Sequence, residues 1–288
     1  MLTVLAPAKL NLTLEVLAKR SDGFHEIRSV IQTINLCDSL HFQLSDEIEV
    51  KCNVPDWVPE ESLVPRAASL LRQATGCSKG ATIEVEKRIP LLSGLGGDSS
   101  DAAATLRGLS RLWGLSLSQE KLLELATELG SDVSFFLCDG TALVEGRGEV
   151  VTPLPPLSPM WAVLMMPPVP RTKGKTGQLY ARLNPSHYTK GLSTKGLVAW
   201  LTEHREIMPS MFFNVFDSIA ADSFSGLGEY REQFLQTGAT SVHLAGSGPA
   251  LFTLVKDKAQ AEKIHEQLKQ QGLESYLAET SASIEWVE

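Results

Sequence analysis

Apolar and polar residues alternate along the first segment of the chain. Over residues 3–16 the larger apolar side chains fall on one side, whereas Lys9 and Asn11 fall together on the other. A period of two residues predicts a half-buried β-strand that points Lys9 and Asn11 in the same direction. Three more segments rich in apolar residues, 25–36, 40–44 and 48–52, predict further strands, so we expect an antiparallel, β-rich start.

Apolar residues then recur every three or four positions, which predicts amphipathic helices. These helices span residues 63–74, 101–113 and 122–129, and a glycine follows the first and the third. A short predicted strand at residues 82–86 leads directly into a glycine-rich segment, which precedes the second helix.

Residues 151–159 contain four prolines and are the best candidate for a linker. Beyond it we expect strands near residues 161–166, 240–245, 250–255, 275–279 and 283–287, and helices near 214–223, 225–236 and 258–271. Strands and helices mix without a regular βαβ rhythm, so the predicted class is α+β. We expect two domains, residues 1–155 and 156–288.

The composition narrows the classes of protein. A net charge of −8 argues against a broad nucleic-acid surface. No apolar run reaches the roughly 18 residues of a membrane helix, and the N-terminus lacks the features of a signal peptide. The four cysteines form no metal-binding or redox pattern, so we expect reduced thiols in a cytoplasmic protein. Monomer and homodimer both stay open.

A glycine-rich segment carries the first candidate chemistry. Its sequence is Pro90-Leu91-Leu92-Ser93-Gly94-Leu95-Gly96-Gly97-Asp98-Ser99-Ser100. Glycines let the backbone approach an anion, and the start of the following helix presents free N–H groups and a positive dipole end. We therefore expect nucleotide phosphates to bind here. Ser99 and Ser100 are suited to capping the helix, binding phosphate or holding Mg²⁺.

Two familiar nucleotide-binding motifs match this segment poorly. A P-loop ends in Gly-Lys-Ser or Gly-Lys-Thr, and the segment has no lysine. A dinucleotide-binding fingerprint needs a third small residue and a distant acidic residue, and Gly94-x-Gly96-x-x-Ser99 matches it only in part. A plain turn with a good helix cap is the simplest alternative, but it requires fewer small residues.

The segment resembles the phosphate-binding motif of the GHMP kinases, and two later segments resemble motifs of that family in the same order. Leu129-Gly130-Ser131-Asp132-Val133 is similar to the segment with the catalytic aspartate, and Leu244-Ala245-Gly246-Ser247-Gly248-Pro249 to the C-terminal glycine motif. The resemblance implies an ATP- and Mg²⁺-dependent small-molecule kinase. It also implies an N-terminal domain like domain 2 of ribosomal protein S5, a ferredoxin-like C-terminal domain, and an active site between them.

Two N-terminal segments resemble one branch of the family. They are Ala6-Pro7-Ala8-Lys9-Leu10-Asn11-Leu12 and Arg20-Ser21-Asp22-Gly23-Phe24-His25-Glu26. This branch phosphorylates the 2-hydroxyl of a cytidine diphosphate-linked methylerythritol in the non-mevalonate isoprenoid pathway. The resemblance implies that Lys9 and Asp132 form the catalytic pair. Of the two serines of the loop, Ser100 is our candidate Mg²⁺ ligand. The implied substrate contacts are Asn11, Phe24, His25, Thr176, Tyr180, Gly246, Ser247 and Gly248.

These roles have a chemical basis. Asp132 would accept the proton of the substrate hydroxyl or orient that hydroxyl, and Lys9 would offset charge on the transferring phosphoryl group. Phe24 replaces the usual tyrosine of the family, and Asp98 replaces the third glycine of the loop. Because a carboxylate beside phosphates is unfavourable, we expect Asp98 to turn away from them or to lie next to Mg²⁺.

Several alternatives stay open at this point. Asp132 could be a helix cap, Lys9 a solvated lysine and His25 an ordinary strand residue. The basic run of Arg171, Lys173 and Lys175 is either a solvated face or an aid in holding a diphosphate. The rival functions are a homoserine or mevalonate kinase, a non-catalytic nucleotide-binding protein and a Rossmann-type oxidoreductase.

Overall fold

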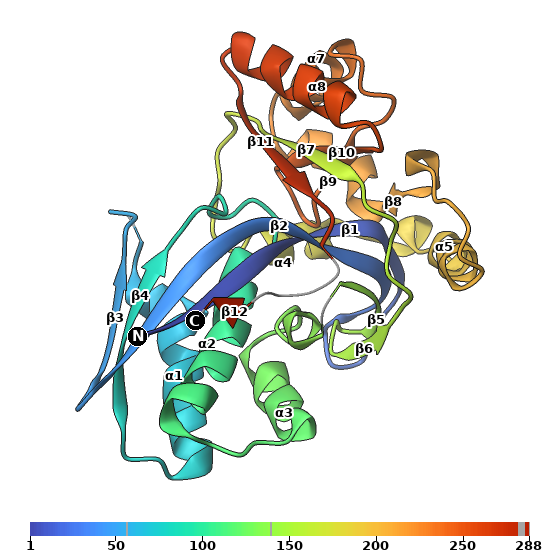
Figure 1. Cartoon of the computed structure of the whole chain (residues 1–288). Helices are drawn as coiled ribbons and strands as arrows, with labels where there is room; N and C mark the ends of the chain where they lie inside the picture. The colour runs from blue at the N-terminus through green and yellow to red at the C-terminus, as the bar shows by residue number, and fades with distance from the viewer. Residues whose placement is uncertain (56, 139, 282–285, 288) are drawn as a thin grey trace.

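The computed structural model describes residues 1–55, 57–138, 140–281 and 286–287. Within these residues the strands form two sheets (Figure 1). The larger contains β1 (Leu2–Lys19), β2 (His25–Ser45), β3 (Ile48–Cys52), β4 (Gly80–Glu86), β5 (Thr141–Gly146), β6 (Val150–Pro153), β8 (Phe213–Asn214) and β12 (Trp286–Val287). Its main path is β12-β1-β2-β4-β3; β5 pairs with β2 and β6, and β8 pairs with β1. The smaller sheet has the order β11 (Glu274–Glu279), β7 (Trp161–Met166), β10 (Leu251–Val255) and β9 (His243–Leu244).

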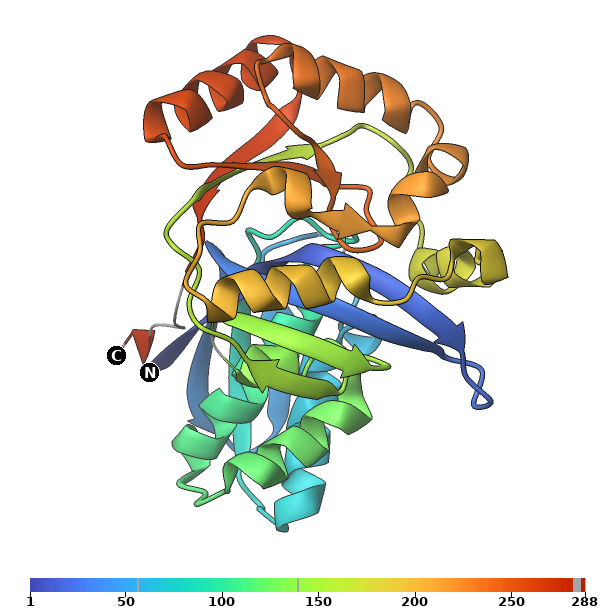
Figure 2. The same ribbon diagram turned by 90° about the vertical axis from the view of Figure 1, so that its right-hand side faces the viewer.

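Helices cover both sheets. The helices α1 (Leu63–Thr75), α2 (Gly97–Trp113) and α3 (Gln119–Leu129) lie on one side of the larger sheet, and α7 (Leu227–Gln236) and α8 (Lys258–Gln270) cover the smaller one (Figure 1). Helix α5 (Leu192–Thr202) lies between the two halves of the molecule (Figure 2). Shorter elements are α4 (Lys175–Arg182), α6 (Ala220–Ser223) and the 3₁₀ turns η1 (Pro59–Glu61), η2 (Phe135–Leu137), η3 (Pro185–His187), η4 (Pro209–Met211) and η5 (Val215–Ser218). No helix among the described residues is long and apolar enough to cross a membrane.

Strands β1 and β2 form the framework of the molecule. They pair antiparallel from Leu2 opposite Phe42 to Lys19 opposite His25. One face packs on the helices α1 to α3, and the other faces the smaller sheet and α5. The prediction of a half-buried first strand is therefore corrected, because a second layer covers it and leaves Lys9 only 4% and Asn11 only 5% exposed.

Two element boundaries differ from the prediction near the site. The predicted strands at residues 25–36 and 40–44 form the single strand β2, because β-bulges absorb the irregular positions and the pairing with β1 continues. Helix α2 begins at Gly97 rather than at residue 101, since Gly96 adopts φ 77° and serves as the N-cap. The glycine-rich segment therefore runs straight into the helix.

The second half shows the larger differences. The predicted linker begins inside β6, where Val151 pairs with Val144. The helix expected near residues 214–223 is instead β8, η5 and α6, and α5 was not expected. The α+β class is confirmed. The domain boundary at residues 155 and 156 stays a prediction, and β8 and β12, which follow it, pair with β1.

Candidate active site

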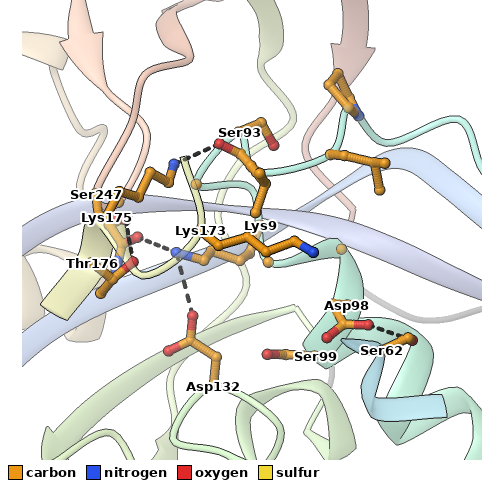
Figure 3. Close-up of a pocket in the computed structure, with 18 of the residues that line it drawn as sticks. Lys9, Ser62, Ser93, Asp98, Ser99, Asp132, Lys173, Lys175, Thr176 and Ser247 are labelled. Atoms are coloured by element: carbon orange, nitrogen blue, oxygen red, sulfur yellow. Dashed lines mark hydrogen bonds and ion pairs between the residues drawn. The ribbon is translucent and has the colours of Figure 1, made fainter. Parts of the chain in front are cut away.

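A cavity of about 560 Å³ is lined by both halves of the chain (Figure 3). Its wall combines β1, the loop before α2, the start of α4 and the loop after β9. The predicted site residues on this wall are Lys9, Asn11, Asp132, Thr176, Tyr180, Gly246 and Ser247, with Pro90, Leu91, Leu92, Ser93, Gly94, Gly96, Gly97, Asp98 and Ser99 of the glycine-rich loop. The fold thus brings together residues from five distant parts of the sequence, at positions 9–11, 90–99, 132, 176–180 and 246–247.

Lys9 and Asp132 meet in this cavity. The Lys9 Nζ donates a 2.6 Å hydrogen bond to Asn11 Oδ1 and lies 3.7 Å from Asp132 Oδ2. The Asn11 Nδ2 donates to Ser29 Oγ at 2.9 Å, which leaves the amide oxygen facing Lys9. The side chain of Asp132 is 39% exposed, whereas Lys9 is buried. A fixed cation thus lies beside a carboxylate that a ligand can reach.

The glycine-rich loop lies directly against this pair. The Lys9 backbone N–H donates to Leu95 O at 2.9 Å and ties the loop to β1. A Cβ atom at Gly96 would lie 3.0 Å from Lys9 Cγ and 2.9 Å from the Phe136 ring. Within the described chain, no side chain caps α2, so its first N–H groups stay available for an anion.

The C-terminal glycine motif supports the loop from the other side. A Cβ atom at Gly94 would lie only 2.0 Å from Ala245 O, and one at Gly246 would lie 2.9 Å from Lys9 Nζ. Both glycines have positive φ, +91° and +54°. The Asn214 Nδ2 donates to Leu244 O and Gly246 O and holds the motif in place. Glycine is required at these positions because the two backbones touch.

Aromatic rings gather at another part of the cavity. The rings of His25 and Tyr180 stack with centroids 5.1 Å apart and an interplanar angle of 28°, and Phe216 contacts Tyr180 edge-on. Tyr180 and Phe216 lie on the cavity wall. The His25 Nε2 is buried without a hydrogen-bond partner among the described residues. Burial, with a smaller effect of Lys19, lowers the pKa of His25, so its ring is favoured in the neutral form.

Some predicted residues lie off the wall. Phe24 is 50% exposed and packs under the Arg147 guanidinium, 4.8 Å from the ring centroid. Its contact with substrate stays a prediction that the observed geometry does not favour. Leu95 and Gly248 contribute backbone contacts from behind the wall.

Asp98 turns toward the start of α1. Its carboxylate accepts a 2.7 Å hydrogen bond from Ser62 Oγ and further bonds from the Leu63 N–H at 3.1 and 3.2 Å. A carboxylate is favourable at this helix start because the first N–H groups carry positive charge. The loop therefore tolerates an acid in place of glycine by giving it donors in a neighbouring helix.

The predicted Mg²⁺ ligand is less accessible than its neighbour. Ser100 is buried and its Oγ has no partner in the described part of the chain, whereas Ser99 lines the cavity. Among described residues no group of three or more His, Cys, Asp and Glu could hold a metal alone. Mg²⁺ commonly takes few protein ligands with phosphate oxygens and water, so the serine hydroxyls and the accessible Asp132 fit such an ion.

The basic run divides into different environments. Lys173 pairs with Glu61 and Arg171 with Glu274, as expected of surface lysines and arginines. Lys175 is buried, and its Nζ donates to Leu92 O in the glycine-rich loop at 2.6 Å. Next to it, Thr176 Oγ1 and Ser247 Oγ lie 2.8 Å apart, which joins α4 to the C-terminal glycine motif.

Sequence reasoning missed a buried ion cluster at the entry to the loop. The Lys87 Nζ on the cavity wall donates to Asp38 and, at 2.7 Å, to Asp101 in α2. Asp38 also accepts from Ile89 N at 2.8 Å. Despite burial, the two carboxylates raise the pKa of Lys87. Nothing in the spacing of these three residues indicates that they meet. The wall segment with Trp57 and Val58 was missed for the same reason.

Comparison with known proteins defines the class of this protein. The profile of the GHMP kinases N terminal domain matches residues 62–140, and that of the GHMP kinases C terminal matches residues 199–273. The chain belongs to the GHMP kinase family, as the sequence motifs predicted, and it is an ATP-dependent kinase.

Its relatives point to one branch. The chain is 49% identical to a 4-diphosphocytidyl-2-C-methyl-D-erythritol kinase from Dehalococcoides mccartyi, over 97% of this chain and 98% of the relative. It is 38% identical to the kinase of that name from Symbiobacterium thermophilum, over 95% and 97%. A crystal structure of 4-(cytidine 5'-diphospho)-2C-methyl-D-erythritol kinase superposes with a TM-score of 0.81 at 33% identity, covering 97% of this chain and 99% of that one. A homoserine kinase from Cytophaga hutchinsonii, at 19% identity, over 99% and 97%, and with a TM-score of 0.74, shares the fold.

Proposed function

We propose that this kinase transfers the γ-phosphate of ATP to the 2-hydroxyl of 4-diphosphocytidyl-2-C-methyl-D-erythritol, in the non-mevalonate isoprenoid pathway. The proposal is carried by one observation: a single cavity holds the Lys9–Asp132 pair against a glycine-rich loop and also an aromatic wall formed by Tyr180 and Phe216. The near full-length similarity to kinases of this name supports it.

The positions of Lys9 and Asp132 support the following course of the transfer. Asp132 takes the proton of the substrate hydroxyl while that oxygen attacks the γ-phosphorus. The bond from the γ-phosphorus to the bridging oxygen breaks, and ADP leaves with the bonding electron pair. Lys9, buried and fixed by Asn11, stabilises the negative charge on the transferring group. When bound, Mg²⁺ would neutralise phosphate charge, with Ser100 the predicted ligand and Ser99 and Asp132 also near.

The two ligands are assigned to different walls. The phosphates of ATP lie at the start of α2, and Trp57 and Val58 beyond the loop offer an apolar surface for its base. The cytosine stacks on Tyr180, and His25 Nε2, buried and without a partner among the described residues, is available to its polar edge. Thr176, Ser247 and Gly246 then lie near the diphosphate. We place the reaction in the cytoplasm, where ATP is available, and assign no oligomeric state.

A substrate comparison tests the proposal. ADP production is measured with the purified chain, ATP and Mg²⁺, using 4-diphosphocytidyl-2-C-methyl-D-erythritol, homoserine or mevalonate as acceptor. We expect turnover with the first and a kcat/KM at least about 10³-fold lower with the other two, because neither has a base to stack on Tyr180 and a diphosphate to bind. Comparable kcat/KM with homoserine or mevalonate would contradict the assignment.

A further inference from the structure

Lys175 occupies an unusual position for a lysine. It begins α4, it is only 7% exposed, and it lies on the wall of the active-site cavity. Its Nζ reaches across the cavity wall to Leu92 O in the glycine-rich loop (Figure 3). A buried lysine is costly unless its charge is compensated, so an anionic partner is expected at this position.

The other cations of the cavity have carboxylate partners. Lys9 pairs with Asp132, and Lys173 pairs with Glu61. For Lys175, by contrast, the described residues provide no carboxylate within ion-pair distance, and its hydrogen-bond acceptor is a neutral carbonyl. Within the described chain, the site therefore contains a buried amine whose charge the protein itself leaves uncompensated.

We propose that Lys175 is a phosphate-binding residue that contacts a phosphoryl oxygen held at the glycine-rich loop. This inference rests on the proposed function, since that function supplies the anion. The candidate anions are the terminal phosphate of ATP and the diphosphate of the cytidine substrate. Lys175 touches the loop that receives the first, and shares α4 with Tyr180, which receives the base of the second.

The charge environment of the amine supports this role. Burial, together with the positive charges of Lys9 and Arg171, lowers the pKa of Lys175 to about 7. Lys9 and Arg171 are the charged residues whose electrostatic effect lowers this pKa. The glycine-rich loop offers the amine only the neutral Leu92 carbonyl, and the nearby carboxylate of Asp132 is paired with Lys9. A phosphate in contact with the amine favours the charged form and raises its pKa. At pH 8 the free protein then holds a mostly neutral Lys175, and ligand binding takes up a proton.

Calorimetry of the intact chain tests this consequence. The nonhydrolysable analogue AMP-PNP with Mg²⁺, and separately cytidine diphosphate, are titrated at pH 8 in two buffers of different ionisation enthalpy. We expect uptake of close to one proton with the ligand that Lys175 contacts, and affinity that falls by up to about tenfold per pH unit above pH 8. A lysine that only supports the loop through Leu92 would give no such uptake.

Three variants separate the possibilities. Lys175→Met should lower the affinity for the contacted ligand by about 10–100-fold, because it removes one charged hydrogen bond. It should also abolish the proton uptake. Lys175→Arg keeps a permanent charge, so it should retain binding but lose the uptake. Lys195→Met, which removes an exposed lysine of α5 that is not part of the cavity lining, should keep the uptake and change affinity by less than about fivefold.

The outcomes are distinct. If Lys175→Met loses affinity for AMP-PNP alone, Lys175 contacts the γ-phosphate of ATP. If it loses affinity for cytidine diphosphate alone, Lys175 contacts the diphosphate of the substrate. Wild-type binding of both ligands without proton uptake, and with unchanged affinity in Lys175→Met, would overturn the role of Lys175 and leave the proposed function intact. Failure of the wild type to bind cytidine diphosphate or turn over the cytidyl substrate, with AMP-PNP still bound, would overturn the proposed function instead.

Discussion

The phosphate end and the aromatic end of the cavity are built in different ways. At the phosphate end, backbone meets backbone: Gly94 lies against the Ala245 carbonyl, Gly246 lies against the Gly94 carbonyl, and the loop carbonyl of Leu95 accepts a hydrogen bond from β1. At the aromatic end, side chains make the surface, with Tyr180 between His25 and Phe216. Backbone contacts tolerate few substitutions, whereas a stacking surface can be altered residue by residue.

This difference indicates how chemistry and specificity are divided. The phosphate end depends on glycines and on a buried, hydrogen-bonded lysine, and a kinase with another acceptor could use it unchanged. The aromatic end depends on α4, which belongs to the second half of the chain. Substitutions at the two ends should therefore affect different kinetic constants.

The largest expected effect is at the phosphate end. Asp132→Ala should lower kcat by about 10²–10⁴-fold, because the hydroxyl loses its proton acceptor. Affinity for AMP-PNP, measured by calorimetry without Mg²⁺, should change only a few-fold, since Asp132 is outside the glycine-rich loop. Asp132→Asn serves as the isosteric control. Wild-type kcat in Asp132→Ala would remove the residue from the catalytic pair.

Tyr180→Ala should produce the main effect at the aromatic end. We expect a loss of about 10–100-fold in affinity for cytidine diphosphate, because base stacking on an aromatic ring is worth about 1–3 kcal/mol. AMP-PNP affinity should be unchanged. Tyr180→Phe keeps the ring and should bind nearly as the wild type does. Equal losses for both nucleotides would show that the two ends are not independent.

Asp98→Gly should affect stability more than catalysis. Removing the acceptor of Ser62 and Leu63 should lower the free energy of unfolding by about 1 kcal/mol, as measured by urea denaturation. The value of kcat should stay within a few-fold, because the carboxylate points toward α1. Asp98→Asn keeps an acceptor and should lose less stability. A large drop in kcat with unchanged stability would place Asp98 in phosphate or Mg²⁺ binding.

Phe24→Ala should have the smallest effect. The ring packs under Arg147 and is half exposed, so affinity for cytidine diphosphate should change by less than about threefold, in line with a surface position. The same titration as for Tyr180→Ala provides the comparison. A loss as large as that of Tyr180→Ala would mean that Phe24 reaches the base when substrate binds.

Much of the first half of the fold was predictable from local pattern. Helix α1 and strand β3 match their predicted ranges to within about a residue, since apolar spacing and a glycine stop define them locally. The region around α5 and α6 was not predictable. There, Asn214 satisfies the backbone of the C-terminal glycine motif, a contact across 30 or more residues that leaves no local pattern.

The sequence alone determined which kinds of chemical group are present. It contains a glycine-rich loop suited to binding an anion, and it contains Lys9 and Asp132, whose catalytic roles are implied by the family resemblance. Only the tertiary structure decided which of these groups meet. It placed Lys9 3.7 Å from Asp132 and turned Asp98 toward α1 and Phe24 toward Arg147. It also buried Lys175 while leaving Lys173 exposed. Residue type and spacing fix what a side chain can do, but burial and charge pairing depend on contacts between distant segments, which no local pattern encodes.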